Sequence, residues 1–264
     1  MNDIAITVRD VGKRFRVHRD DRSWTLQEAV LGCLRRRRPP VTFWALREIS
    51  FTVKRGSSLA ILGRNGSGKS TLLRVLGRII RENEGSVSIR GRVGGLLDLG
   101  AGFHGDLTGR ENVFIGSVVA GLTRKETAAR LDRIVEFAEL EGCIDTPLRC
   151  YSTGMQMRLA FSVAAHVNPD VLLIDEVLAV GDLGFQRKCI RCLGELKEAG
   201  CTIVIVTHDT SLVPGLCDES LWLQDGRLVR QGPAVEVCSE YLAHFEDEPA
   251  GAARSASTLE AFQP

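Results

Sequence analysis

The chain has 264 residues, and its 34 Lys and Arg against 33 Asp and Glu leave a formal net charge of +1. This balance excludes a bulk field that would draw the protein to nucleic acid or anionic lipid. A content of 44% hydrophobic and 25% charged residues excludes wholesale disorder, collagen and coiled-coil rods. Because no apolar run approaches the roughly 20 residues of a membrane span, and residues 1–10 carry acids where a signal peptide is basic, we expect a cytosolic protein.

The first hundred residues predict strands grouped around a glycine-rich loop. Alternating apolar and polar residues are typical of edge or antiparallel strands, and a short all-apolar run is typical of a buried strand. The expected elements are antiparallel strands over 4–8 and 49–53, a buried strand over 58–62, a helix over 69–80 and a strand over 86–93.

The rest of the chain alternates helices with buried strands, so the fold class is α/β. A second glycine-rich loop spans 96–109. The expected elements are helices over 111–120, 124–140, 154–167 and 185–199, strands over 171–174 and 202–206, a hairpin about Asp225 and Gly226, and a short helix before a solvated tail.

A glycine-rich motif predicts a phosphate-binding loop. The run Gly63, Arg64, Asn65, Gly66, Ser67, Gly68, Lys69, Ser70, followed by Thr71, fits G-x-x-x-x-G-K-[ST] and lies between an apolar strand and a helix. Its backbone N–H groups would wrap the phosphates of a nucleotide and the helix would add its positive end. Lys69 would reach the β- and γ-phosphates, and Ser70 would ligate Mg²⁺.

Three polar residues follow buried strands. Asp175 and Glu176 come after the strand over 171–174, at the strand end where open α/β sheets bind ligands. We expect Asp175 to hold Mg²⁺ through water and Glu176 to act as general base on the attacking water. His208, after the strand over 202–206, would contact the γ-phosphate.

Four motifs stand in a fixed order: the phosphate loop, Tyr151-Ser152-Thr153-Gly154-Met155, the strand with two acids, and His208. In these motifs the chain resembles the ATP-binding-cassette ATPase family, over about residues 4 to 235. The resemblance implies a P-loop NTPase (RecA-like) core with an antiparallel β edge and an inserted α-helical subdomain. It divides the chain into a core at 1–95 and 168–240 with an insertion at about 16–43, a helical subdomain at 96–167 and a tail at 241–264.

In that family the signature Ser and Gly reach across a dimer to the γ-phosphate bound by the other subunit. Here the signature residues would be Ser152, Thr153 and Gly154, and Asp182 resembles the D-loop acid that joins the two sites. Thr153 and Met155 replace the Gly and Gln of the usual signature. The resemblance therefore implies a head-to-tail homodimer with ATP and Mg²⁺ at composite sites.

Three segments narrow the resemblance. They are Leu96 to His104, the run Leu107-Thr108-Gly109-Arg110-Glu111-Asn112, and the insertion between Phe15 and Trp44. All three resemble the polysaccharide-export subfamily in particular. The family's loop Gln has no counterpart between Gln27 and Gln156, and Asp98 is the nearest substitute as a metal or water contact. The adenine-stacking aromatic is either Phe15 or Trp44, and Phe15 is preferred.

The run Arg35 to Arg38 has two interpretations. It is either a solvated basic turn or a contact for lipid headgroups or the membrane partner. Nucleic-acid binding is disfavoured because no groove-reading motif accompanies these arginines.

The eight cysteines fit reduced, small apolar side chains better than disulfides. Cys189 and Cys192 lack the further ligands of a zinc site.

The resemblance thus implies an ATPase at the cytoplasmic face of the bacterial inner membrane. It would be bound peripherally through a permease dimer, without nucleic acid, and would drive export of a polysaccharide or lipid-linked glycan. The alternatives are an ATPase of a lipid or drug exporter and a non-transport cassette acting on ribosomes or DNA. A P-loop kinase or GTPase would leave Tyr151 to Met155 unexplained, and the guanine-reading N-K-x-D is absent from the sequence.

Overall fold

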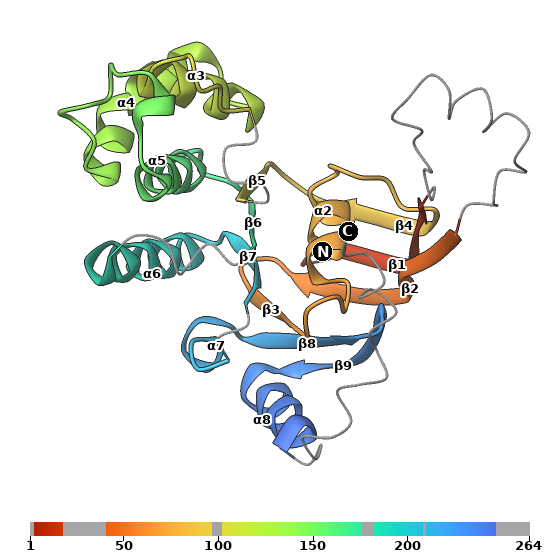
Figure 1. The fold of residues 1–264 in the computed structure, drawn as a ribbon. Coiled ribbons are helices and arrows are strands. Elements are labelled where there is room, and N and C mark those ends of the chain that lie inside the picture. The colour runs from red at the N-terminus through yellow and green to blue at the C-terminus, as the bar shows by residue number, and fades with distance from the viewer. Residues whose placement is uncertain (1–2, 18–40, 97–101, 176–181, 208–209, 247–264) are drawn as a thin grey trace, which may run out of the picture.

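The computed structural model describes residues 3–17, 41–96, 102–175, 182–207 and 210–246, which form two sheets, flanking helices and a separate helical part (Figure 1). None of the described helices has the length and apolar character of a membrane span. The strands are β1 (Ile4–Val17), β2 (Val41–Lys54), β3 (Ser58–Leu62), β4 (Glu84–Ile89), β5 (Val93–Leu96), β6 (Val171–Asp175), β7 (Thr202–Val206), β8 (Glu219–Gln224) and β9 (Arg227–Pro233). The helices are α2 (Lys69–Leu76), α3 (Gly109–Val119), α4 (Arg124–Ala138), the 3₁₀ turn η1 (Leu148–Cys150), α5 (Thr153–His166), α6 (Leu183–Glu198), α7 (Val213–Leu216) and α8 (Ala234–Glu246).

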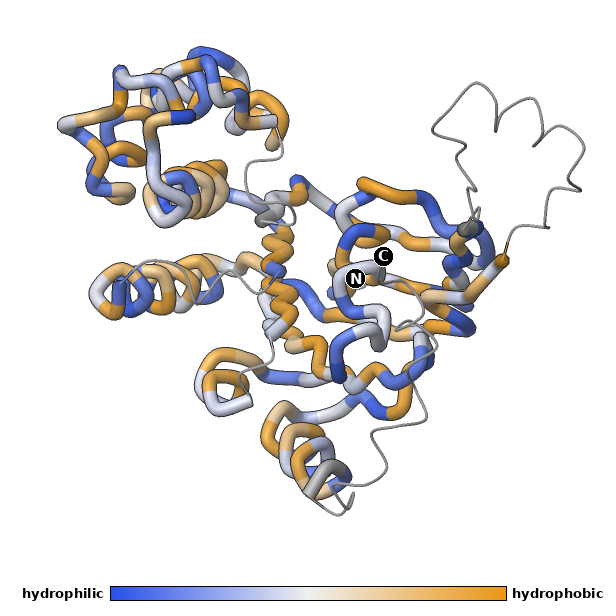
Figure 2. The backbone as a smooth tube through the Cα atoms, viewed as in Figure 1, coloured by the Kyte–Doolittle hydropathy of each residue, from blue (hydrophilic) through white to orange (hydrophobic). Residues whose placement is uncertain are grey.

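The larger sheet has six strands in the order β5-β6-β7-β3-β8-β9. All neighbours are parallel except the hairpin pair β8 and β9. Both β3 and β7 are buried at every position, because helices cover one side of them and α2 together with the second sheet covers the other. Their residues form the hydrophobic centre seen in Figure 2. Burial on both faces explains why the sequence shows continuous apolar runs here.

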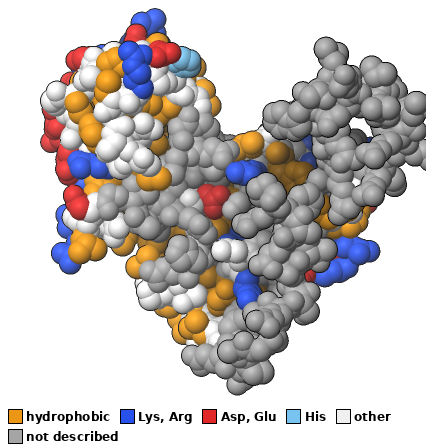
Figure 3. All heavy atoms as spheres, viewed as in Figure 1, with side chains coloured by type: hydrophobic (Ala, Val, Ile, Leu, Met, Phe, Trp, Pro, Cys, Tyr) orange, Lys and Arg blue, Asp and Glu red, His pale blue; other side chains and the backbone are white. Residues whose placement is uncertain are grey.

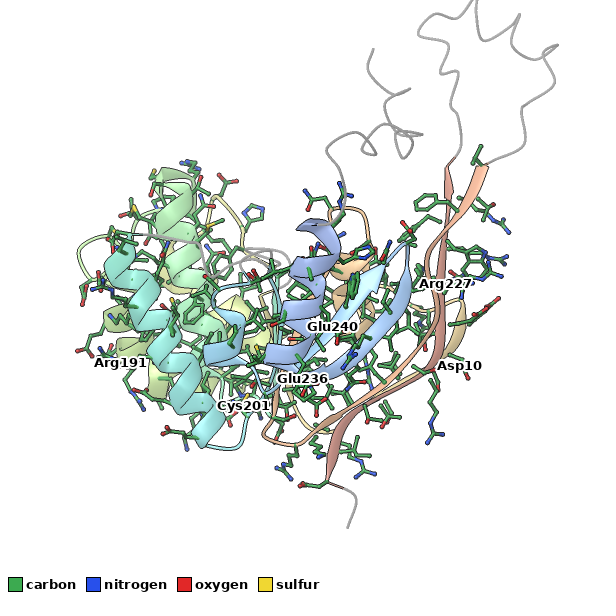
Figure 4. The ribbon with its side chains drawn as sticks, turned by 90° about the horizontal axis from the view of Figure 1, so that it is seen from below. Asp10, Arg191, Cys201, Arg227, Glu236 and Glu240 are labelled. Atoms are coloured by element: carbon green, nitrogen blue, oxygen red, sulfur yellow. The ribbon has the colours of Figure 1, made fainter. Side chains whose placement is uncertain are left out.

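The smaller sheet is antiparallel, in the order β2-β1-β4. Its inner residues, among them Ile6, Val8 and Phe51, pack in the same core as α2 and β3. The edge strand β2 lies beside β9, where Arg227 Nη1 donates to a carboxylate oxygen of Glu48 at 2.8 Å (Figure 4). The antiparallel edge expected from residues 4–8 and 49–53 is confirmed, and both strands are longer than those ranges.

Three helices and η1 build the helical part, which has its own core around Ile134 and Leu159. The helices α3 and α4 each begin with a capping box, in which Thr108 and Thr123 accept from the backbone N–H of Glu111 and Glu126 while the Glu carboxylates bond back. Acidic and basic side chains alternate along the outer margin of this part in Figure 3. The helical insertion between β5 and β6 therefore has a core of its own, and its helix α5 also packs into the main core through Phe161, Ala164 and Ala165.

One predicted element is wrong. The strand expected over 86–93 is two strands, β4 in the small sheet and β5 in the large one. The chain turns at Gly91, whose φ of +94° and close approach to Asp170 exclude a side chain, and Arg92 N–H then donates to the Asp170 carboxylate at 2.7 Å. In addition, α2 ends at Leu76 rather than at residue 80.

Candidate nucleotide site

The phosphate loop joins β3 to α2, as the motif predicts. Gly66 and Gly68 have φ of +84° and +104°, values that glycine adopts without strain. A Cβ at Gly68 would lie 2.6 Å from the carbonyl oxygen of Ala45, and one at Gly63 would lie 2.4 Å from that of Leu223. Glycine is required at these two positions because neighbouring backbone closes in on the loop.

Lys69, the first residue of α2, is 6% exposed. Its Nζ donates to the carbonyl oxygens of Gly63 at 2.8 Å and Arg64 at 3.1 Å, so the ammonium is held over the loop. Ser67 is buried, and its Oγ has no hydrogen-bond partner among the residues that the structure describes. A buried hydroxyl of this kind, beside a lysine and the N-terminus of a helix, fits an anionic ligand.

Ser70 and Asp175 are brought together from α2 and the end of β6. Ser70 Oγ lies 3.4 Å from Asp175 Oδ1, so two oxygen ligands face each other beside the loop. Magnesium prefers oxygen ligands and is usually held by one or two protein groups together with phosphate oxygens and water. The two side chains lie 105 positions apart in the sequence and were both predicted as Mg²⁺ ligands. Their contact fits a Mg²⁺ site.

The strands β3, β6 and β7 are parallel and adjacent, so their carboxyl ends lie at one edge of the sheet. The phosphate loop, Asp175 and the buried Thr207 all stand at this edge. Three residues assigned from the sequence, Glu176, His208 and Asp98, lie outside the described residues, so their roles stay predictions.

The remaining loop residues differ in exposure. Arg64 and Asn65 are exposed, whereas Thr71 is half-buried on the first turn of α2. Arg64 additionally contributes its carbonyl oxygen to Lys69 and to the N–H of Ser67. The described geometry thus uses backbone atoms of the loop for shape and leaves the side chains of Arg64 and Asn65 at the surface.

The two aromatic candidates for adenine stacking lie on opposite faces of the β1–β2 ladder. Phe15 pairs in register with Phe43, with ring centroids 5.8 Å apart. Trp44 pairs with Arg14, whose guanidinium lies 5.8 Å from its ring. Side chains of paired residues share a face and successive residues alternate, so Phe15 and Trp44 do not act together. The preference for Phe15 stays a prediction.

The signature residues stand at the start of α5. Ser152 is the N-cap and accepts from the N–H of Met155 at 3.2 Å; Ser152 and Thr153 are exposed and Gly154 is half-buried. The first turn of α5 carries no acid. This N-terminus therefore presents backbone N–H groups and a hydroxyl outward, an arrangement that suits a phosphate.

The signature end and the phosphate loop belong to different parts of the chain. Within the described residues α5 packs against α3, α4, α6 and β5, whereas α2 packs against β2, β4, β6 and β7 (Figure 1). Asp182, the acid assigned to the D-loop, is exposed and caps α6 by accepting from Phe185 N–H at 2.9 Å.

One residue of the motif has a role that the sequence left unassigned. Tyr151 is 5% exposed, and its hydroxyl donates to the carbonyl oxygen of Cys143 at 2.7 Å. Burial raises the pKa of the phenol, so it stays protonated and keeps donating. Gln156 Nε2 donates back to the Tyr151 carbonyl at 3.3 Å. Tyr151 thereby fixes the backbone directly before Ser152.

Three buried cysteines of the main core do not supply a nucleophile to the site. Burial raises the pKa of Cys189 and Cys217 to about 12 and that of Cys201 to about 11, so all three stay thiols. They pack in the main core, as expected of small apolar side chains.

Comparison with known proteins identifies relatives over most of the chain. The ABC transporter family model matches residues 46–179. An O-antigen export system ATP-binding protein of Klebsiella pneumoniae is 48% identical over 75% of this chain and 81% of its own length. One of Myxococcus xanthus is 46% identical over 90% of this chain and 55% of its own, so the chain spans about half of that relative. A teichoic acids export ATP-binding protein of Levilactobacillus brevis is 43% identical over 75% and 55%.

Solved structures share the fold. An ATP-binding cassette, solved as a dimer in a post-hydrolysis state with ADP and Pi, aligns with a TM-score of 0.70 at 24% identity, over 87% of this chain and 98% of its own. A component of an ABC transporter complex from Clostridium perfringens aligns with a TM-score of 0.63 at 26% identity, over 92% and 94%. The P-loop core with an antiparallel edge and a helical insertion is confirmed by these likenesses.

Proposed function

The chain belongs to the ABC transporter family as an ATP-binding cassette, and from this premise we propose that it hydrolyses ATP to energise a membrane permease that exports a polysaccharide or lipid-linked glycan. The observation that carries the proposal is the phosphate loop with buried Lys69 held over it and Ser70 facing Asp175. These contacts support the proposal, because phosphoryl transfer uses a lysine on the phosphates and oxygen ligands for Mg²⁺.

In the proposed reaction, water attacks the γ-phosphorus in line with the leaving ADP oxygen. Lys69 and the backbone N–H groups of the loop stabilise charge on the phosphates, and Ser70 and Asp175 hold Mg²⁺, which neutralises the developing negative charge when bound. Glu176 accepts the proton of the attacking water, and His208 contacts the γ-phosphate. Catalysis is then mostly positioning and electrostatics.

We assign the other half of each site to a second copy of the chain. The exposed Ser152 and half-buried Gly154 at the start of α5, and exposed Asp182 at the start of α6, are separated from the phosphate loop of the same chain by the fold. A head-to-tail homodimer places them against the partner's ATP, as the dimeric state of a solved relative of the same fold suggests.

The cargo is proposed from the relatives. Those of Klebsiella pneumoniae and Myxococcus xanthus belong to O-antigen export systems, and that of Levilactobacillus brevis to teichoic acid export. These names support a polysaccharide or lipid-linked glycan as the exported cargo. The chain would act at the cytoplasmic face of the inner membrane, docked on a permease dimer.

The test is ATP hydrolysis by the purified chain, with and without membranes that contain the permease encoded beside it. We expect hydrolysis that is lost in Lys69→Ala and Glu176→Gln and that changes when the permease is present. Hydrolysis that ignores the permease but rises with ribosomes or DNA would instead identify a non-transport cassette.

A further inference from the structure

The helix α4 ends in an uncommon conformation. Its C-cap, Glu139, has φ of 57° and ψ of 48°, the left-handed region in which glycine is the usual residue. A side chain there costs conformational energy, which persists only where the surroundings compensate for it. The contacts of the Glu139 side chain therefore indicate why a glutamate stands at this position.

The Glu139 carboxylate bridges two helices. One oxygen is hydrogen-bonded to Arg158 of α5, and the other accepts from Lys188 Nζ of α6 at 3.2 Å. These cations also satisfy the last carbonyls of α4: Arg158 Nε donates to Ala138 at 2.9 Å, and Lys188 Nζ donates to Phe137 at 2.9 Å. Three helices are thus joined by one carboxylate and two cations at the C-terminus of α4.

Aromatic rings pack beneath this ion-pair network. Phe185 of α6 is 2% exposed, and its ring centroid lies 5.9 Å from that of Phe137 and 6.3 Å from that of Phe161 on α5. The guanidinium of Arg158 lies 5.0 Å from the Phe185 ring, and Lys188 Nζ lies 4.7 Å from the Phe137 ring. The apolar contacts fix the separation of the helices, and the charges fix their rotation.

The two helices held here carry the groups that face the second copy. Arg158 lies six residues, about 1.7 turns, along α5 from Ser152, and Lys188 lies the same distance along α6 from Asp182. Figures 1 and 4 show α5 and α6 side by side. Any change in their spacing at Glu139 alters the distance between the signature serine and the D-loop acid.

We propose that Glu139 is a positioning residue for ATP hydrolysis, which holds α5 and α6 so that Ser152 and Asp182 form one rigid surface against the partner's nucleotide. This inference rests on the proposed function. Glu139 touches neither the phosphate loop nor its ligands, so it acts on the transition state through the two helices. The hydrogen bond from Lys188 and the charge of Arg158 hold the pKa of Glu139 below its usual value, so the carboxylate stays ionised at neutral pH.

The informative variant is Glu139→Gly, because glycine relieves the backbone strain while it removes the carboxylate. We expect kcat to fall about fivefold while the ATP affinity of the phosphate loop stays unchanged. The fall in kcat should not be matched by a loss of stability, measured as Tm. Glu139→Asp keeps a carboxylate and should retain more of kcat than the glycine variant. Arg78→Gly is the matched control, since Arg78 is exposed after α2 with φ of 57°.

A double-mutant cycle of Glu139→Gln with Lys188→Met separates the network from general destabilisation. We expect losses in kcat that are not additive, because both variants break the same link. Hydrogen exchange adds a readout that is independent of activity: amides over 153–166 and 183–198 should exchange faster in Glu139→Gly than in Arg78→Gly.

The inference is overturned if Glu139→Gly matches the parent in both kcat and hydrogen exchange of α5 and α6. If the parent shows no hydrolysis that depends on Lys69, the proposed function fails, and the exchange experiment still decides whether Glu139 joins the two helices. The two failures are therefore distinguishable.

Discussion

The phosphate loop and the signature end of α5 are built in opposite ways. The phosphate loop is enclosed by the backbone of β2, of β8 and of the turn between β8 and β9, and its lysine is buried. The signature serine is exposed at a helix N-terminus, and side chains such as Tyr151 and Glu139 hold the helices behind it. The loop is thus enclosed within one chain, whereas the signature serine faces outward.

This difference separates two kinds of mutational effect. Under the proposed function, changes in the loop would act on nucleotide binding in the same chain. Changes behind the signature would act on a partner's site through helices whose positions depend on side-chain contacts. The variants below test this distinction in order of decreasing effect.

The largest loss is expected from Lys69→Ala. Removal of the buried ammonium takes away charge stabilisation in both the ATP-bound and transition states, so hydrolysis should fall by about 100-fold or more. Phosphate release at saturating ATP measures the effect. Lys54→Ala, at the exposed end of β2, is the control and should hydrolyse ATP like the parent.

Gly68→Ala should destabilise the fold by more than about 2 kcal/mol, because its Cβ would meet the Ala45 carbonyl at 2.6 Å and its φ is +104°. Gly66→Ala is the matched variant, since φ is +84° but nothing lies within 4 Å, and it should cost only about 1 kcal/mol. Urea unfolding compares the two. Equal losses would show that backbone conformation, rather than enclosure, requires glycine in this loop.

Asn112→Ala tests the helical part. The Asn112 side chain is fully buried; its Oδ1 accepts from His104 N–H at 2.6 Å and its Nδ2 donates to three carbonyls, including that of Thr108 at 2.9 Å. The variant leaves the His104 N–H without its acceptor, whereas each of the three carbonyls keeps a backbone N–H donor, and the loss should cost about 1–3 kcal/mol. We expect faster hydrogen exchange confined to residues 102–166, with the phosphate loop and its sheet unaffected. Acceleration throughout the chain would contradict a separate core in this part.

A small pH effect is expected at Asp218, which links β8 to β3. Burial works against its ionised form, but hydrogen bonds from Lys197 and Ser58 outweigh it and hold the pKa of Asp218 below its usual value. Its contribution is therefore present above the unfolded-state pKa of about 4 and is lost as the pH falls through the lower folded-state pKa. Because the carboxylate is half exposed, Asp218→Asn should cost less than about 1 kcal/mol at pH 7. Unfolding of the parent and the variant should converge near pH 2, and a difference that persisted there would exclude the ion pair as its cause.

Sequence patterns predicted most of the core because its strands are short apolar runs that end in motif residues. The run over 202–206 matches β7 at both ends, and Ser70 and Asp175 meet as the motif requires. The division of residues 86–93 between two sheets escaped prediction because the turn at Gly91 depends on contact with Asp170, about 80 positions away. The left-handed conformation of Glu139 likewise depends on partners from two other helices.

The measurement that tests the composite site most directly is the mass in solution of Glu176→Gln with ATP and Mg²⁺, determined by light scattering. We expect a head-to-tail dimer, which has about twice the 28.9 kDa of one chain, and adding Ser152→Arg should return the mass to that of one chain. A Glu176→Gln chain that binds ATP at saturation yet keeps the mass of one chain would contradict the composite site.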